Sequence, residues 1–342
     1  MRILLISPML PEIGGVSIST GRLKDRLVAD GHQVQVFSMS YKNPSFNNKW
    51  LRMIRFLLAP FFVLFQPRYE IIHCHVSGIF RMRYLLLFKR FYHGAKLIFT
   101  VHRDVGRVFK GRVSKDFCKA DCLICVQPGD ANRLKQKLSN VKAVDIPAFI
   151  LPTNIDESAV PHDVLSFVKF SSEPVIIVTG SIVLDGNFYD LYGLQDAINL
   201  YKTLKSNGLQ LKLLVIITGN VMSQQQASFF NSMTALVTND ENVMITSLIK
   251  MPLMPLFKYA KIFLRPTKTD GDALSVREAL AMKCSVLASD VSVRPEGSIT
   301  YHNEDECVDK ATRILRDKLA SSFATVEFYN EIVQLYDRVL KG

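Results

Sequence analysis

The stretch Asp270-Gly-Asp-Ala-Leu-Ser-Val-Arg-Glu278 decides the fold of this chain, and it directly follows the apolar run at residues 261–265. A strand that ends in Gly271 and restarts as a helix near Ala273 points unpaired backbone N–H groups at whatever lies above it. The positive end of the helix dipole points the same way. The pattern therefore predicts an anion site at the start of the helix.

Two carboxylates bracket this helix start. Glu278 falls one turn beyond Leu274 and Ser275 on the same helix face, so a ligand with phosphate at the helix tip would offer hydroxyls to Glu278. Asp270 precedes the turn and would face the other end of that ligand. Phosphate held between two hydroxyl-binding carboxylates describes a nucleotide-sugar. The alternative is that Asp272 caps the helix and that both carboxylates are solvated.

The rest of the chain predicts two α/β domains. Its 342 residues exceed the roughly 250 to 300 at which single hydrophobic cores stop growing. Apolar runs alternate with helical stretches, so each domain is expected to be a parallel sheet wound on both faces. Pro147, Pro152 and Pro161 mark a linker, and a final helix at about residues 324–340 carries an apolar stripe that must pack on something. The expected strands are residues 2–7, 34–39, 70–75, 96–101, 122–126 and 143–146, then 175–179, 212–218, 243–245, 262–264 and 285–288.

The charge of the chain is concentrated in its first half. Residues 1–150 hold 24 Lys and Arg against 9 Asp and Glu, whereas residues 151–342 hold 18 against 22. Residues 51–100 carry eight basic groups and one acidic group. These are interleaved with an apolar block, which comprises Phe56, Leu57, Leu58, Phe61, Phe62, Val63, Leu64 and Phe65.

An anionic membrane surface attracts such a mixture by apolar insertion and by about 1 kcal/mol per well-placed Lys or Arg. We therefore expect an anionic membrane as a partner and no nucleic acid, because no nucleic-acid motif is present. The alternative is a buried helix with a solvated basic rim.

No signal peptide or apolar span of ~18 residues is visible, so we expect a cytoplasmic protein, peripheral on the inner face of the cytoplasmic membrane.

Two further elements have the placement of ligand-binding residues. Gly14 and Gly15 follow a strand and precede a helix, where missing side chains let the backbone approach a phosphate. A dehydrogenase would need G-x-G-x-x-G here and an acidic residue at the end of the second strand, and neither is present. His102 follows an apolar strand at its carboxyl end, where open α/β sheets bind ligands. His73 and His75 alternate on one strand, which permits a metal pair but offers no evident third ligand.

Cys118, Cys122 and Cys125 have the C-x3-C-x2-C spacing of an iron–sulfur site. Cys122 and Cys125, however, lie on an expected buried strand, and a cluster needs a loop that wraps three thiolates around iron. We expect free thiols in a reducing compartment.

Segments between Phe263 and Gly297 resemble the donor site of glycosyltransferase family 4, a group of retaining GT-B enzymes. These segments are Arg-Pro-Thr, Thr-Asp-Gly-Asp, Ser-Val-Arg-Glu-Ala-Leu-Ala, Ala-Ser-Asp-Val and Arg-Pro-Glu-Gly. The opening Met-Arg-Ile-Leu-Leu-Ile-Ser-Pro, followed by Gly-Gly-Val-Ser and Gly-His-Gln-Val, resembles the opening of the same family. The resemblance implies a GT-B fold, in which two Rossmann-like, doubly wound parallel-sheet domains face a cleft.

The resemblance also implies the division of the chain and its site residues. Residues 1–151 would form the acceptor and membrane-facing domain, 152–172 the linker, 173–323 the nucleotide-sugar domain, and 324–342 a helix returning to the first domain. His102 and Asp270 would be catalytic. The donor-binding residues would be Gly14, Gly15, Arg265, Lys268, Gly271, Leu274, Ser275 and Glu278.

The chain departs from the family at two cations that neutralise the donor diphosphate. Gly180-Ser181-Ile182 stands where many members carry an Arg, and Tyr192-Gly193 stands where they carry a Lys. Three outcomes are open. Another cation replaces the missing Arg and Lys, helix N-termini alone bind the diphosphate, or the chain has lost catalysis. The candidate substitutes are Arg265, Lys268, Arg103 and Arg107.

The expected activity is retaining transfer of a sugar from a UDP- or GDP-linked donor to a lipid-linked saccharide in cell-surface polysaccharide synthesis. The leaving phosphate would take the acceptor proton while the N–H groups of Leu274 and Ser275 hold the developing charge, and no metal is required. The alternatives are a GT-B-like nucleotide-sugar epimerase and a catalytically silent, membrane-bound binding subunit.

Overall fold

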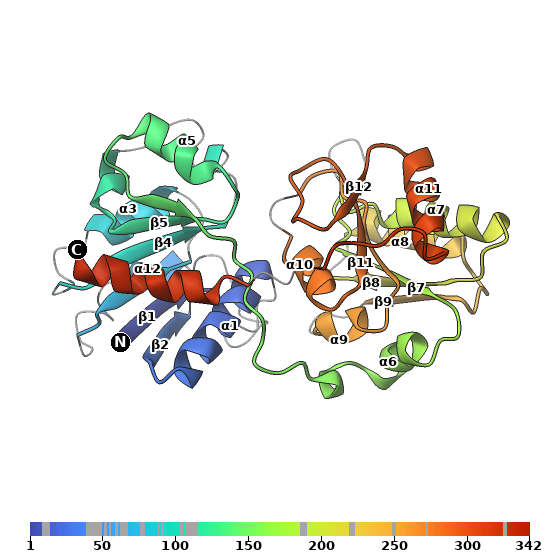
Figure 1. Ribbon diagram of the computed structural model, residues 1–342, viewed down its shortest axis with the longest axis horizontal. Helices are drawn as coiled ribbons and strands as arrows, with labels where there is room; N and C mark the ends of the chain where they lie inside the picture. The colour runs from blue at the N-terminus through green and yellow to red at the C-terminus, as the bar shows by residue number, and fades with distance from the viewer. Residues whose placement is uncertain are drawn as a thin grey trace. The chain divides into compact units, whose positions relative to one another are not determined.

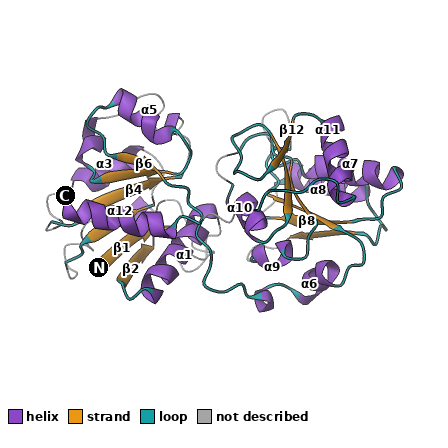
Figure 2. Ribbon diagram, viewed as in Figure 1, coloured by secondary structure: helices purple, strands orange, loops and turns teal. Residues whose placement is uncertain are grey.

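The computed structural model describes residues 1–8, 14–38, 50, 53–54, 56–58, 61, 68–75, 79–87, 89, 92, 94–102, 105–106, 115–184, 190–218, 223–247, 251–270, 273–323 and 327–342. The chain divides into two compact units, which are Met1–Thr153 with Glu327–Gly342, and Asn154–Val326. Each unit is a parallel sheet with helices on both of its faces (Figures 1 and 2). The predicted α/β class with two doubly wound parallel sheets is confirmed.

The first unit contains a six-stranded sheet in the order β2-β1-β3-β4-β5-β6. Its strands are β1 Arg2–Ser7, β2 Gln33–Ser38, β3 Ile71–Cys74, β4 Lys96–Val101, β5 Cys122–Cys125 and β6 Ala143–Asp145. Its helices are α1 Gly15–Ala29, α3 Ile79–Leu87, the short 3-10 helix η3 Lys115–Lys119, α5 Asp130–Lys137 and α12 Tyr329–Lys341.

Side-chain alternation along the strands gives this sheet a hydrophobic core on each face. Ile3 and Leu5 of β1 pack with α1 and α12, whereas Leu4 and Ile6 pack with α3, α5 and η3. Helix α12 lies across the strands beside α1, although α1 ends at Ala29 and α12 begins only at Tyr329 (Figure 1). Its apolar stripe includes Tyr336, which is buried in the same core.

The second unit contains a six-stranded sheet in the order β12-β11-β10-β7-β8-β9. Its strands are β7 Val175–Gly180, β8 Lys212–Ile217, β9 Val243–Ser247, β10 Ile262–Arg265, β11 Ser285–Ser289 and β12 Ile299–Tyr301. Its helices are the 3-10 helix η4 Glu157–Ala159, α6 His162–Lys169, α7 Leu194–Ser206, α8 Gln224–Ala235, α9 Met254–Phe257, α10 Leu274–Ala281 and α11 Glu304–Leu315.

The second unit differs from the sequence expectation at two places. The segment expected to be a linker, residues 152–172, contains α6, whose Val164 and Val168 are buried in the core beneath β7 and β10. The edge strand β12 was not predicted, because its three partly exposed residues form too short a pattern to recognise.

Helices α7, α8 and α11 cover one face of the second sheet, and α6, α9 and α10 cover the other.

Candidate active site

Helix α10 begins where strand β10 ends, at the carboxyl edge of the second sheet. Its N-cap residue is Ala273, which has extended backbone angles and makes no side-chain capping bond. The first N–H groups of a helix have no acceptor inside it, so those of Leu274 and Ser275 are available at its positive end. Gly271 and Asp272 lie outside the described residues.

Glu278 lies on α10 and is 4% exposed. A carboxylate is stable at such burial only when hydrogen-bonding partners satisfy it. Leu274 and Ser275, one turn earlier on the same helix, are half-buried. The start of α10 and the Glu278 carboxylate therefore lie about one turn apart on a single helix, and their binding of a ligand stays a prediction.

Asp270 is held by two guanidinium groups. Arg265 donates from Nε to Oδ2 at 2.9 Å and from Nη2 to Oδ1 at 3.1 Å. Arg294 donates from Nη1 to the same Oδ2 at 2.7 Å. Burial by itself would raise the pKa of Asp270, but the hydrogen bonds and charges of the two arginines outweigh burial and hold this pKa below its usual range.

The two arginines are also fixed to the ends of neighbouring strands. Arg265 donates to the carbonyl of Thr179 on β7 at 3.2 Å. Arg294 donates from Nε to the carbonyl of Ser289 on β11 at 2.8 Å, and from Nη2 to the Ser289 hydroxyl at 3.0 Å. The sequence pattern predicts no separate function for Arg294. The overlooked signal is a basic residue just beyond the carboxyl end of a buried strand.

Tyr192 supports Arg265 from the side. The Arg265 Cζ lies 5.2 Å from the centroid of the Tyr192 ring, a cation–π arrangement. A Cβ atom on Gly180 would lie 2.4 Å from the Tyr192 Cβ, so only glycine fits beside this ring. Gly193, at φ +67°, starts α7 so close to Pro266 that a Cβ would lie 2.3 Å from the Pro266 carbonyl oxygen.

Lys268, the other cation predicted for this site, forms an exposed ion pair with Asp196 of α7. The Lys268 charge is therefore already paired with a carboxylate, although an exposed ion pair of this kind contributes little to stability. Arg103 and Arg107, the remaining candidate substitutes, lie outside the described residues.

In the first unit, three histidines meet where β3 and β4 end. The two strands are paired in parallel, so the residues that follow them reach the same edge of the sheet. The His75 Nδ1 and His102 Nε2 atoms lie 3.0 Å apart, within hydrogen-bonding distance. His73 places its two ring nitrogens 2.6 Å from the Tyr336 hydroxyl and 2.7 Å from the Thr100 hydroxyl.

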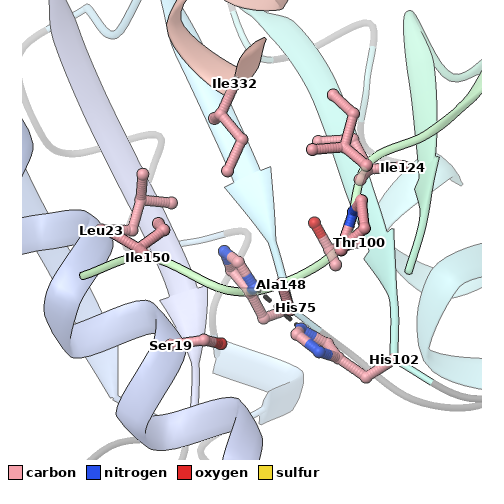
Figure 3. A pocket seen from close by; sticks show the side chains of 11 residues that line it. Ser19, Leu23, His75, Thr100, His102, Ile124, Ala148, Ile150 and Ile332 are labelled. Atoms are coloured by element: carbon pink, nitrogen blue, oxygen red, sulfur yellow. Dashed lines mark hydrogen bonds between the residues drawn. The ribbon is translucent and has the colours of Figure 1, made fainter. Parts of the chain in front are cut away.

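His75 and His102 line a small pocket, shown in Figure 3 with Ser19 and Thr100 as its other polar side chains. The Nε2 atom of His75 is buried and has no hydrogen-bond partner within the described part of the chain. The remaining lining is apolar and comes from α1, β5, α12 and the segment after β6. One small polar group, such as a hydroxyl, would satisfy this nitrogen.

Burial keeps this histidine cluster neutral at physiological pH. Burial lowers the pKa of His102 to about 4 and, with the added charge of His102, lowers the pKa of His73 to about 3. The pKa of His75 is also lowered well below its ordinary value by burial and by both neighbours. A neutral imidazole both donates and accepts a hydrogen bond, which suits contact with a hydroxyl.

Gly14 and Gly15 start helix α1. The backbone of Gly14 is extended, and a Cβ atom on either glycine would meet nothing within 4 Å. Among the described residues, therefore, nothing requires glycine at these positions and nothing fills the space beside them. The Ser17 hydroxyl accepts the Gly14 N–H at 3.0 Å and fixes the loop.

The described residues contain no group of three or more His, Cys, Asp or Glu side chains suited to a metal ion. The six cysteines form no disulfide bonds, and Cys122 and Cys125 are buried on β5. Among the helices described above, none combines the length and hydropathy needed to cross a membrane.

Comparison with known proteins relates this architecture to one class of enzyme. A glycosyltransferase from Rickettsia africae ESF-5 has a TM-score of 0.67 and 14% identity, covering 100% of this chain and 99% of its own. The catalytic domain of starch synthase IV from Arabidopsis thaliana, bound to ADP and acarbose, has a TM-score of 0.66 and 12% identity over 100% and 99% of the two chains. Anabaena HepE, in complex with UDP and glucose, has a TM-score of 0.61 and 10% identity over 100% and 97%. At these identities the structures show the fold alone, and no curated protein matches the sequence.

The fold is that of the GT-B glycosyltransferases. Residues 13–150 match the family model described as Glycosyltransferase Family 4. This match and the fold together indicate a glycosyltransferase.

Proposed function

We propose that the chain transfers a sugar from a nucleoside diphosphate sugar to a lipid-linked saccharide, with retention of the anomeric configuration. The observation that carries the donor proposal is the start of α10, where the first N–H groups of the helix, the charge of Arg265 and the buried Glu278 lie on adjoining elements. The phosphate groups would bind at the helix tip and Glu278 would accept the ribose hydroxyls.

The residues support a reaction without a protein nucleophile. Asp270, which precedes the helix start, is engaged by two arginines and is poorly placed for attack on a sugar carbon. In the proposed reaction the leaving phosphate takes the proton of the acceptor hydroxyl on the same face of the sugar. The N–H groups of Leu274 and Ser275 hold the charge that develops on that phosphate, and no metal ion is needed.

In the first unit we propose His102 as a contact of the transferred sugar. Its ring is neutral at pH 7 because burial lowers its pKa to about 4. The bond to His75 fixes the orientation of the ring. Gly14 and Gly15 leave open space at the start of α1, which suits close approach of the donor phosphates.

An apolar surface in the first unit supports a lipid-linked acceptor. Phe80 and Leu87 of α3 are 63% and 70% exposed. The Tyr84 hydroxyl of the same helix donates to the Leu57 carbonyl at 2.6 Å, which joins α3 to the segment carrying the exposed Leu58. Phe56 is buried, so that segment is partly core and partly surface. Phe62 and the basic Arg52 and Arg55 lie outside the described residues.

Exposed apolar side chains beside basic ones are what an anionic bilayer surface binds. We therefore propose a peripheral position on the inner face of the cytoplasmic membrane, where lipid-linked saccharides for the cell surface are extended. The net charge of +11 favours the same surface.

Thermal unfolding in the presence of UDP, GDP, ADP and TDP tests the donor proposal. A nucleotide at 100 times its dissociation constant adds about 2.7 kcal/mol to the free energy of unfolding. We expect one or two of the four to raise the unfolding temperature. A chain that none of the four stabilises would not bind a nucleotide-sugar at α10.

A further inference from the structure

Asp270, Arg265 and Arg294 form one buried charged cluster. The side chains of Arg265 and Asp270 are each 10% exposed, and that of Arg294 is 3% exposed. The guanidinium groups of Arg265 and Arg294 share the single carboxylate of Asp270. Within the described residues, Asp270 is the only carboxylate paired with either arginine, so the cluster carries one positive charge in excess.

This excess positive charge destabilises the folded chain unless an anion pairs with it. An uncompensated charge at this burial is destabilising, and proteins normally pair it. Asp190 is the other buried carboxylate of the neighbouring turn, but it accepts the N–H groups of Tyr192 and Gln195 at the start of α7. Among the described residues, no second carboxylate pairs with either arginine, which leaves this charge for a ligand at the start of α10, just beyond Asp270 in sequence.

Arg265 still has donors to offer. A guanidinium group has five N–H bonds. Among the described residues, Arg265 donates three of its five, two to Asp270 and one to Thr179. Arg294 likewise uses three of its N–H bonds, at Ser289 and Asp270, but its side chain is 3% exposed against 10% for Arg265. Arg265 is thus the member of the cluster suited to touch a phosphate, and Arg294 is not.

We propose that Arg294 is a positioning residue whose charge cancels that of Asp270, so that Arg265 keeps a full positive charge for the donor diphosphate. Without Arg294, Arg265 and Asp270 form a neutral bidentate pair with little attraction for a phosphate. Asp270 then serves to aim the guanidinium of Arg265 rather than to bind a sugar hydroxyl. This inference rests on the proposed binding of a nucleoside diphosphate sugar at α10.

The test compares three variants of the full chain by calorimetric titration. They are Arg294→Gln, the double variant Asp270→Asn with Arg294→Gln, and the control Arg313→Gln on the exposed face of α11. The probes are whichever of UDP, GDP, ADP and TDP binds the wild type most tightly, and the matching uncharged nucleoside. Thermal unfolding of each variant checks that it is folded.

We expect Arg294→Gln to weaken diphosphate binding on the order of tenfold, because one charge several ångströms from the phosphate is lost at low effective dielectric. Nucleoside binding should stay unchanged. The double variant should regain most of the loss, since removing the Asp270 charge releases that of Arg265. A purely structural Arg294 would make the double variant at least as weak as the single one.

Diphosphate binding that is unchanged in Arg294→Gln, or that is not regained in the double variant, overturns the inference while leaving the proposed function standing. Should Arg294→Gln alone fail to fold, the double variant is compared with the wild type directly. Affinity within about threefold of wild type is then expected, and a tenfold loss contradicts the inference. A wild-type chain that binds none of the four diphosphates overturns the proposed function and this inference together.

Discussion

The hydroxyl of Tyr336 lies 2.6 Å from Nδ1 of His73 and joins helix α12 to strand β3, across 263 residues of sequence. Both side chains are fully buried. The other ring nitrogen of His73 lies 2.7 Å from the Thr100 hydroxyl, so hydroxyl groups satisfy both sides of a neutral imidazole. The last helix is thereby fixed to the sheet edge that also carries His75 and His102.

Replacing Tyr336 with Phe should destabilise the first unit by about 1 to 3 kcal/mol, because it leaves a buried His73 nitrogen without a partner. Urea unfolding of the full chain measures the loss. Asp337→Asn, on the exposed face of the same helix, is the control and should change little. Equal stability of Tyr336→Phe and wild type would show that this bond contributes nothing.

Acidification should weaken the first unit before its carboxylates titrate. The pKa values of His102 and His73 fall to about 4 and about 3 in the folded chain, against about 6.5 when unfolded. The unfolded chain therefore binds more protons between these values, and stability falls as pH drops from about 6.5 toward 4. Each histidine contributes up to about 1.4 kcal/mol per pH unit.

Urea midpoints measured at pH 7, 6 and 5 check this dependence. A His73→Gln variant should show a shallower decline than wild type, since one of the groups that resists protonation is gone. A wild-type midpoint that does not move between pH 7 and pH 5 would contradict a buried, neutral histidine cluster.

The strands were predictable because parallel-sheet strands buried on both faces are nearly continuous apolar runs. All eleven expected strands occur, as the runs at β1 and β7 illustrate. Helix α6 was read as linker because prolines and acidic residues surround it, and only its packed position reveals that Val164 and Val168 are core.

The candidate site was predictable at α10, where local spacing sets the geometry, and less so where distant segments meet. The pairing of His75 with His102 depends on the register of β3 against β4. The contact of Arg294 with Asp270 spans 24 residues and a whole strand. No local pattern encodes either contact, so the sequence alone does not predict the pairing of Asp270 with Arg294.

Glu278→Gln should lower donor affinity at least several-fold, because hydrogen bonds to a charged acceptor are about 1 kcal/mol or more stronger than neutral ones. Titration with the nucleoside diphosphate measures the change. Glu306→Gln, on the exposed side of α11, controls for a general charge effect. If Glu278→Gln is folded and binds as wild type does, Glu278 does not contact the ribose.

Replacing Phe80 and Leu87 with Ser should reduce binding to phosphatidylglycerol vesicles while leaving nucleotide binding intact. Each side chain that inserts contributes in proportion to the apolar area it buries. Phe170→Ser is a matched control, since Phe170 is 75% exposed but lies at the end of α6 in the other unit. Salt should weaken wild-type binding as well. Failure of the wild type to bind these vesicles at low salt would remove the membrane proposal.

Incubation of the chain with labelled nucleotide-sugars, with and without membrane lipid extract, tests the proposed activity most directly. We predict that label moves to the lipid fraction only when the extract is present, and that the new linkage keeps the anomeric configuration of the donor. Isomerised sugar formed without the extract would instead indicate an epimerase. Nucleotide binding with no transfer to any lipid fraction would contradict catalysis by this chain.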